Sequence, residues 1–376
     1  MKALILSCST GGGHNAAGYA LKEQIEREGG EACFLDYLTL AGGNVSRIVA
    51  NAYIELVKRA PCLFGLVYLL GDFVSRLTTK SPVYLANSKM AKYLDKYLSQ
   101  NDYDVILMPH LYPAETITYM KTQGKKLPLT IAVATDYTSI PFWGETRCDY
   151  YMIPDAALSD CFVHQNIKKE QLVATGIPVS PVFSDVKNMS KQKARNILGI
   201  RTRNPVHLII GGSMGAGNIK KLTNEILKRK TQKERIIVIT GSNHTLCTKL
   251  KKTFHKEPSV AILGHTAQMP LFMKACDVIY TKPGGLTSTE AAVSQIPLIH
   301  TSPIPGCETL NRDFFQKRGM SFSAKTVSGQ ASAGAHLMKN SSARIRMQNC
   351  QAQNIDDQAA KRIYDFIEKI LCSSEN

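Results

Sequence analysis

The chain has 376 residues, which is enough for two or three domains of ordinary size with a substantial buried core. Hydrophobic residues make up 44% of the chain and charged residues 20%, a composition that excludes wholesale disorder. The formal net charge is +16, so the partners to consider first are anionic: a membrane surface, a nucleic acid or a phosphorylated substrate.

The 10 cysteines occur without a Cys-x-x-Cys pair and without the Cys/His spacing of a metal site. No signal peptide precedes the first apolar segment, and no apolar run reaches the roughly 20 residues of a membrane-spanning helix. We therefore expect reduced thiols in a cytoplasmic protein that needs no metal ion.

Charge divides the chain into two unequal halves. Residues 1–185 hold 17 basic and 18 acidic side chains, whereas residues 186–376 hold 29 basic and 12 acidic ones. We place a domain boundary there. The expected domains are an N-terminal one over 1–185, a second over 186–345, and a C-terminal helix over 346–376 that can pack back on the first.

The first half alternates apolar strands with helical patterns. Predicted strands cover residues 3–7, 32–36, 105–108 and 129–133, and a helix covers 15–28. The later strands are apolar on both faces, which is typical of a parallel sheet covered by helices.

The second half repeats this plan with a strand, a glycine turn and a helix at residues 206–210, 211–217 and 218–230. Further strands are predicted at 235–240, 260–263, 278–280 and 297–300, and further helices at 245–254, 269–275 and 356–371. The fold class is therefore α/β, with two tandem Rossmann-like, doubly wound domains facing a cleft. Residues 326–345, rich in Ser, Ala and Gly, are expected to be weakly specified.

The first glycine turn consists of Gly11, Gly12 and Gly13, which let backbone N–H groups approach a ligand closely. His14 follows, and its imidazole is a candidate base for an acceptor hydroxyl; alternatively it only bonds to nearby backbone. The spacing Gly11-x-Gly13-x-x-Ala16, followed by Asp36, also fits a dinucleotide motif, so an NAD-dependent oxidoreductase is an alternative.

The second turn contains Gly212, Ser213, Met214 and Gly215. Because it lies between a strand and a helix, it presents a helix N-terminus that suits a diphosphate. The alternative is a tight turn that serves packing alone.

A third motif places Gly284, Gly285, Leu286 and Thr287 before a helix that carries Glu290. The Glu290 carboxylate can accept hydrogen bonds from the vicinal hydroxyls of a ribose, or it can serve only as a helix-capping charge. A fourth motif offers Glu308 and Asn311, the paired acceptor and donor that sugar hydroxyls need.

These motifs, in this order, carry a family resemblance. The matching pieces are STGGGHNAAG, TDYTSIPFW, GGSMGAGN, KPGGLTSTEA and SPIPGCETLN. Over about residues 1–320 the sequence resembles the monogalactosyl- and monoglucosyl-diacylglycerol synthase group of glycosyltransferases. That group is related to the peptidoglycan-precursor N-acetylglucosaminyltransferase.

The resemblance implies a GT-B fold in which the C-terminal half binds a UDP-sugar and the N-terminal half binds a lipid acceptor. It assigns the turn 212–215 to the diphosphate, Glu290 to the ribose, and Glu308 with Asn311 to the sugar. Gly264, His265 and Thr266 would line the uracil. His14 and Asp136 fall on the acceptor side. Cys307 and Thr309 flank Glu308 where the family commonly carries Gln or Glu, so the identity of the sugar stays open.

The implied reaction is a direct displacement at the anomeric carbon that inverts it and makes a glycolipid from diacylglycerol. Three roles are open for Asp136: it is the base, it orients His14, or it has a purely structural role. Helix N-termini and basic side chains, without a metal or other cofactor, would stabilise the departing UDP.

An apolar stretch at residues 61–70 is too short to span a bilayer and is flanked by basic residues. It fits a segment that lies on an anionic membrane surface, or a helix pair that covers the sheet. Its candidate membrane contacts are Leu63, Phe64, Leu66, Val67, Leu69 and Leu70. The protein would then be peripheral on the inner face of the cell membrane.

Three alternatives remain beside the leading hypothesis. The first is an N-acetylglucosamine transferase that acts on a lipid-linked peptidoglycan precursor. The second is the oxidoreductase named above, and the third is a membrane-lipid binder without catalytic activity. Nucleic acid is not expected as a partner, because the sequence has no recognisable reading motif and no aromatics interleaved with its basic clusters.

Overall fold

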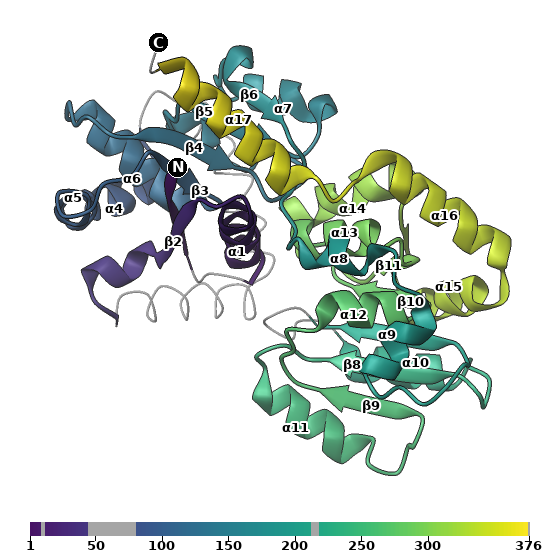
Figure 1. The fold of residues 1–376 in the computed structure, drawn as a ribbon. Helices are drawn as coiled ribbons and strands as arrows, with labels where there is room; N and C mark the ends of the chain where they lie inside the picture. Colours follow the sequence, from purple (N-terminus) through teal and green to yellow (C-terminus); the bar gives the residue numbers. More distant parts are fainter. Residues whose placement is uncertain (9–11, 44–79, 212–217, 375–376) are drawn as a thin grey trace. The chain divides into compact units, whose positions relative to one another are not determined.

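The computed structural model describes residues 1–8, 12–43, 80–211 and 218–374, and it divides into two compact units (Figure 1). Unit 1 comprises Met1–Pro181, Pro305–Cys307 and Gln358–Asn376. Unit 2 comprises Val182–Ile304 and Glu308–Asp357. The chain therefore crosses from one unit to the other more than once.

Unit 1 is built on a six-stranded parallel sheet in the order β2-β1-β3-β4-β5-β6. The strands are β1 (Lys2–Ser7), β2 (Glu31–Asp36), β3 (Val105–Met108), β4 (Leu129–Val133), β5 (Tyr150–Ile153) and β6 (Leu172–Ala174). The central strands are buried on both faces, which confirms the sequence pattern.

Helices cover both faces of this sheet. They are α1 (Gly12–Arg27), α4 (Pro82–Ser88), α5 (Ala91–Leu98), α6 (Leu111–Thr122), α7 (Ser159–Val163) and α17 (Ala359–Ser374). Alternate strand residues divide between two cores: Ile5 packs with residues of α1 and α17, and Leu4 with residues of α5 and α6. This alternation is the period of two that a strand imposes on its side chains.

The C-terminal helix α17 is part of unit 1. Ile363 and Ile367 are fully buried in the core beneath the sheet, and burial of each contributes roughly 1.5–3 kcal/mol. Arg362 also donates to the Thr175 carbonyl oxygen, at 2.9 Å from Nε and 2.7 Å from Nη2. The last helix of the chain thus completes the core formed by the first half.

Unit 2 has a second six-stranded parallel sheet, in the order β12-β11-β10-β7-β8-β9. The strands are β7 (Val206–Ile210), β8 (Arg235–Ile239), β9 (Val260–Leu263), β10 (Val278–Thr281), β11 (Leu298–His300) and β12 (Phe322–Ser323). Helices α8 (Val182–Lys187), α9 (Lys191–Ile197), α10 (Ile219–Leu227), α11 (His244–Thr253), α12 (Met269–Ala275), α13 (Gly285–Val293), α14 (Cys307–Lys317), α15 (Val327–Lys339) and α16 (Ser341–Asn354) accompany it.

The expectation that residues 326–345 are weakly specified was wrong, because this stretch forms α15 and the start of α16. Thr326 caps α15 by accepting from the Gly329 N–H. A Cβ at Gly334 would lie 1.6 Å from the buried Tyr280 hydroxyl oxygen, so α15 can approach the sheet only with a small residue there. At this position close packing, not disorder, explains the small residue.

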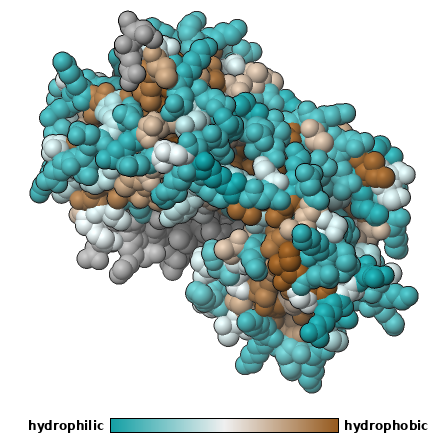
Figure 2. Space-filling model, viewed as in Figure 1, coloured by the Kyte–Doolittle hydropathy of each residue, from teal (hydrophilic) through white to brown (hydrophobic). Residues whose placement is uncertain are grey.

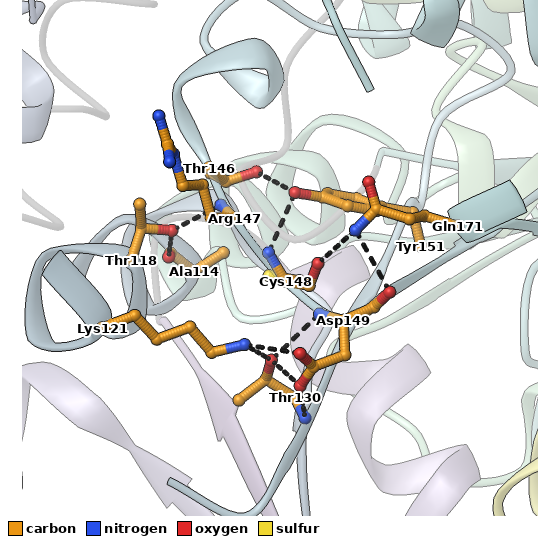
Figure 3. Close-up of polar contacts among 10 residues, drawn as sticks. All are labelled: Ala114, Thr118, Lys121, Thr130, Thr146, Arg147, Cys148, Asp149, Tyr151 and Gln171. Carbon is orange, nitrogen blue, oxygen red and sulfur yellow. Dashed lines mark hydrogen bonds and ion pairs between the residues drawn. The ribbon is translucent and has the colours of Figure 1, made fainter. Parts of the chain in front are cut away.

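A polar network closes the amino end of unit 1's sheet (Figure 3). The Asp149 carboxylate accepts from Lys121 Nζ at 2.8 Å and from the Thr130 hydroxyl at 2.6 Å. Burial alone would raise the pKa of Asp149, but these hydrogen bonds outweigh it and hold that pKa below its usual value. The network fixes the segment that leads from β4 into β5.

Candidate active site

The carboxyl ends of β1, β3 and β4 lie next to one another in unit 1 and bring three distant loops together. His14 follows β1, Pro109 follows β3, and Thr135 follows β4. His14 Nδ1 lies 2.8 Å from the Pro109 carbonyl oxygen and 2.9 Å from Thr135 Oγ1. The imidazole therefore lies at the edge where parallel sheets place ligands.

The contact with Pro109 fixes how the His14 ring carries its proton. A carbonyl oxygen can only accept, so Nδ1 is the protonated nitrogen and Nε2 keeps its lone pair. Burial lowers the pKa of His14, while the charge of Asp136 and the Pro109 carbonyl act in the opposite direction. A neutral imidazole with an unprotonated Nε2 is what a general base requires.

A second histidine, which the sequence analysis missed, lies beside the first. The rings of His110 and His14 meet edge to face, with centroids 4.5 Å apart and an interplanar angle of 68°. His110 Nδ1 accepts from the Tyr112 N–H and caps α6. Burial, and then the neighbouring His14, hold the pKa of His110 well below its usual value. A histidine two residues after an apolar strand was the signal that could have identified it.

The first glycine turn continues directly into helix. Gly12 and Gly13 are the first two residues of α1, and Gly11 lies outside the described residues. The Ser7 hydroxyl, at the end of β1, donates to Asn15 Oδ1 at 2.6 Å and ties the strand to this helix. The helix N-terminus lies at the carboxyl edge of the sheet, as the strand–turn–helix pattern predicted.

In unit 2 the third motif forms the link between β10 and α13. Gly284 is the N-cap of α13, Gly285 and Leu286 are buried, and Thr287 is partly exposed. Glu290 lies on the second turn, where the described part of the chain gives its carboxylate no hydrogen-bond or ion-pair partner. Burial raises its pKa to about 8. Such a group gains most from a ligand that donates hydrogen bonds.

Glu308 has the opposite environment. It is 6% exposed, and both carboxylate oxygens are engaged: Oε1 with Lys282 Nζ at 2.6 Å and Oε2 with the Ile304 N–H at 2.8 Å. Lys282 is a residue of the third motif to which the sequence analysis gave no role. It ties that motif to the fourth and neutralises the carboxylate predicted to meet the sugar.

Asn311 is fully buried and donates through Nδ2 to the Pro283 carbonyl oxygen at 3.1 Å. This contact fastens α14 to the turn before α13. Direct contact of Asn311 with a sugar stays a prediction; the geometry shows how it positions the turn.

Gly264, His265 and Thr266 follow β9 and line an open cavity of about 660 Å³. Apolar residues including Ile200, Ile237 and Phe272 form much of its wall. Figure 2 shows hydrophobic side chains gathered on unit 2 around α12, the helix that contributes Phe272. The cavity is large enough for a nucleobase, whose placement here stays a prediction.

Several predicted residues fall outside the described residues. They are Gly11, Gly212, Ser213, Met214, Gly215, Leu63, Phe64, Leu66, Val67, Leu69 and Leu70. Within residues 1–8, 12–43, 80–211 and 218–374, no group of three or more His, Cys, Asp or Glu is arranged to hold a metal ion. In the same ranges, no helix has the length and apolar character needed to cross a bilayer.

Comparison with known proteins agrees with this architecture. The family model described as monogalactosyldiacylglycerol (MGDG) synthase matches residues 14–179, and the glycosyltransferase family 28 C-terminal domain matches residues 206–368. A processive diacylglycerol beta-glucosyltransferase of Bacillus pumilus (strain SAFR-032) is 27% identical over 322 residues, covering 85% of this chain and 82% of the relative.

Two solved structures illustrate the fold. MurG of Acinetobacter baumannii has a TM-score of 0.63 at 14% identity, covering 98% of this chain and 100% of its own. The UDP-GlcNAc 2-epimerase of Neisseria meningitidis, bound to UDP-GlcNAc, has a TM-score of 0.64 at 13% identity, covering 98% of this chain and 100% of its own. The fold alone therefore accommodates more than one activity.

Two Rossmann-like units, each with a glycine-started helix at the carboxyl edge of its sheet, together with these matches, define a glycosyltransferase of the GT-B fold. The two family models match consecutive parts that make up most of the chain. Through these two matches the chain resembles the diacylglycerol glucosyltransferases and the monogalactosyldiacylglycerol synthases.

The Lys282–Glu308 pair yields a prediction for stability. In Lys282→Met the Glu308 carboxylate stays buried without its cation, so the free energy of unfolding of unit 2 should fall by about 1–3 kcal/mol. The double variant Lys282→Met/Glu308→Gln should lose less than Lys282→Met alone, because the stranded charge is gone. Urea unfolding measures both.

Lys317→Met serves as the control, because Lys317 is an exposed lysine on the same helix as Glu308 and takes part in no ion pair among the described residues. It should unfold like the wild type. Simple additivity of the two changes in the double variant would contradict the proposed charge compensation.

Proposed function

We propose that the protein transfers a hexose from a UDP-sugar to diacylglycerol or a related membrane lipid, with inversion, and so makes a glycolipid. The observation that carries the proposal is the His14 imidazole, whose Nδ1 proton is committed to a backbone carbonyl and whose Nε2 can accept a proton. The lipid acceptor is inferred from the relative's name and from the MGDG synthase match.

The reaction is one displacement step. The glycerol hydroxyl gives its proton to His14 Nε2 while its oxygen bonds to the anomeric carbon, and the bond from that carbon to the UDP oxygen breaks. The Asp136 charge favours the protonated form of His14, and we assign Asp136 the role of stabilising the imidazolium. Attack from the face opposite UDP inverts the anomeric centre.

The donor is proposed to lie against unit 2. The N-terminus of α13 and the turn 212–215 would bind the diphosphate, because a helix N-terminus and free backbone N–H groups favour negative charge. Glu290 would accept from the ribose hydroxyls, and Glu308 with Asn311 would fix the sugar. The same fold binds UDP-GlcNAc in the Neisseria epimerase, which supports a nucleotide sugar as donor. We propose that no metal takes part.

The membrane part of the proposal rests on the sequence. Residues 61–70 are apolar with basic flanks, and diacylglycerol stays in the bilayer, so we place the protein peripherally on the inner face of the membrane. No comparison favours the peptidoglycan-precursor transferase, the oxidoreductase or the non-catalytic lipid binder over this function.

The deciding experiment incubates the purified protein with diacylglycerol vesicles and UDP-glucose, UDP-galactose or UDP-GlcNAc. Mass spectrometry identifies the lipid product, and the proton coupling of the anomeric centre gives its configuration. The proposal expects a β-linked hexosyl-diacylglycerol. Failure of every donor to be consumed would refute it.

His14 should be required for the chemical step. We expect His14→Asn to lower kcat by about 10²–10⁴-fold, because the acceptor hydroxyl loses its base. Since burial lowers the pKa of His14 from 6.5, wild-type kcat at saturating UDP-sugar should fall only when the pH drops below that value. His164→Asn changes an exposed histidine of unit 1 and should keep the wild-type pH profile.

Glu290 should make UDP binding depend on pH. A carboxyl group with a pKa of about 8 holds a proton at pH 7, and both oxygens can accept from a ribose only after that proton leaves. UDP affinity should therefore rise between pH 6.5 and 8.5 in the wild type. Glu290→Gln should abolish this rise. The ionisation of UDP itself is the same in both titrations, so it does not account for a difference between the two proteins. Calorimetric titration at several pH values tests it, and equal pH slopes for the two proteins would count against a ribose contact.

A further inference from the structure

We propose that unit 2 carries a second ligand site, at the amino end of its sheet, that takes an organic phosphate with an apolar part. A cavity of about 360 Å³ lies there, lined from α8, α9, α12, α16 and the segments that lead into β10 and β11. Helix α12 packs against both α8 and α9. The inference does not depend on the proposed transfer reaction.

This cavity is separate from the candidate active site. Asp277, which lines it, precedes β10, whereas Lys282 and Gly284 of the third motif follow the same strand. The four residues of β10 span about 13 Å at about 3.3 Å each. A ligand here would thus lie at the opposite edge of the sheet from the donor motifs.

The lining carries an excess of positive charge. Its charged members are Lys187, Lys191, Lys274, Arg344 and Asp277. The single carboxylate is already shared, because Lys191 pairs with one oxygen of Asp277 and the buried Arg195 contacts the other at 2.8 Å. Lys187 pairs with Asp357 at 3.4 Å. Two cations of the lining, Lys274 and Arg344, have no carboxylate partner among the described residues.

Those two cations bind only to uncharged groups within the described part of the chain. Lys274 Nζ donates to the Lys187 carbonyl oxygen at 2.6 Å, and Arg344 Nη1 donates to the carbonyl oxygens of Leu337 and Met338 at 2.5 and 2.8 Å. Both side chains are partly buried. Burial, and then the charge of Lys191, lower the pKa of Lys274. An anion in the cavity would relieve this repulsion.

The rest of the wall combines the polar side chains of Ser190, Ser294, Gln295 and Gln348 with an apolar part. Phe183, Met273 and Ile296 each expose 3% or less of their surface and line the cavity beside the cations. A phosphate group has several acceptor oxygens. The Arg344 guanidinium can donate hydrogen bonds to them, and a lysine contributes a point charge. The site therefore fits a ligand with a phosphate at one end and a small apolar group at the other, from either a soluble metabolite or a lipid headgroup.

Methionine methyl groups offer a direct readout, because Met189 and Met273 line the cavity. With methyl-¹³C-methionine in the full chain, we would titrate inorganic phosphate, glycerol 1-phosphate and monomeric dihexanoyl-glycerol phosphate, and assign the two signals from Met→Leu variants. Saturable shifts of both methyls, unaffected by excess UDP, are expected. Tightest binding by dihexanoyl-glycerol phosphate points to a lipid source, and equal binding by glycerol 1-phosphate to a soluble one. Titration of all three probes without movement of either methyl would overturn the proposal.

Charge variants test the chemistry. Lys274→Met and Arg344→Met should each weaken binding about tenfold or more, the usual effect of losing a charge-assisted hydrogen bond. Lys193→Met is the matched control, since Lys193 is an exposed lysine on α9 that does not line the cavity, and it should bind like the wild type. If one variant does not fold, the binding of the other variant and the methyl shifts of the wild type still test the proposed site. Equal weakening by Lys193→Met would show general charge attraction and overturn the site.

Discussion

The hydrogen bond between His14 and the Pro109 carbonyl joins residues 95 positions apart, and it sets the position of the imidazole at the carboxyl edge of unit 1's sheet. It forms because β1 and β3 are parallel neighbours in a fixed register, with Leu4 opposite Ile106. A slip of one residue would turn each strand's side chains to the other face of the sheet and move the loop carbonyl away from the imidazole. The buried strands therefore do more than stabilise the fold: they hold Nδ1 of a histidine against a backbone carbonyl that can only accept a hydrogen bond.

Unit 2 uses two carboxylates in opposite ways. The carboxylate oxygens of Glu308 both have partners, Lys282 Nζ and the Ile304 N–H. Glu290 has no such partner in the described part of the chain, and burial raises its pKa to about 8. Two side chains of the same type in one unit therefore lie in different environments: one has its hydrogen-bond partners within the fold, and the other is buried without them.

Much of the fold was predictable because buried parallel strands leave a continuous apolar signal. The strand at 206–210 matches β7 in full, and β3 and β4 also match. The strands β5 and β6 were missed because they are short, with the sequences YYMI and LVA, and only short helical turns and α7 (Ser159–Val163) connect them. Residues 326–345 were misread because their small side chains are set by a neighbour distant in sequence, Tyr280.

Motif residues could be read from the sequence, but their pairings could not. His110 acquires significance only once β1 and β3 are known to be adjacent, and Lys282 only once α14 is placed beside β10. Both relations are set by strand order, which a local pattern does not contain. Glu290, by contrast, belongs to a single strand–turn–helix unit, and its helical context followed from spacing alone.

The charge asymmetry between the two halves also has a structural side. At the amino end of unit 1's sheet, Lys121 and Asp149 form a matched pair that also binds the Thr130 hydroxyl (Figure 3). At the corresponding end of unit 2's sheet, Asp277 is the single carboxylate in a cavity lining that contains Lys187, Lys191, Lys274 and Arg344. A fold that needed only to close this edge could do so with one pair, as unit 1 does. The surplus in unit 2 keeps partly buried positive charge beside a cavity, at a cost in self-repulsion that a bound anion removes.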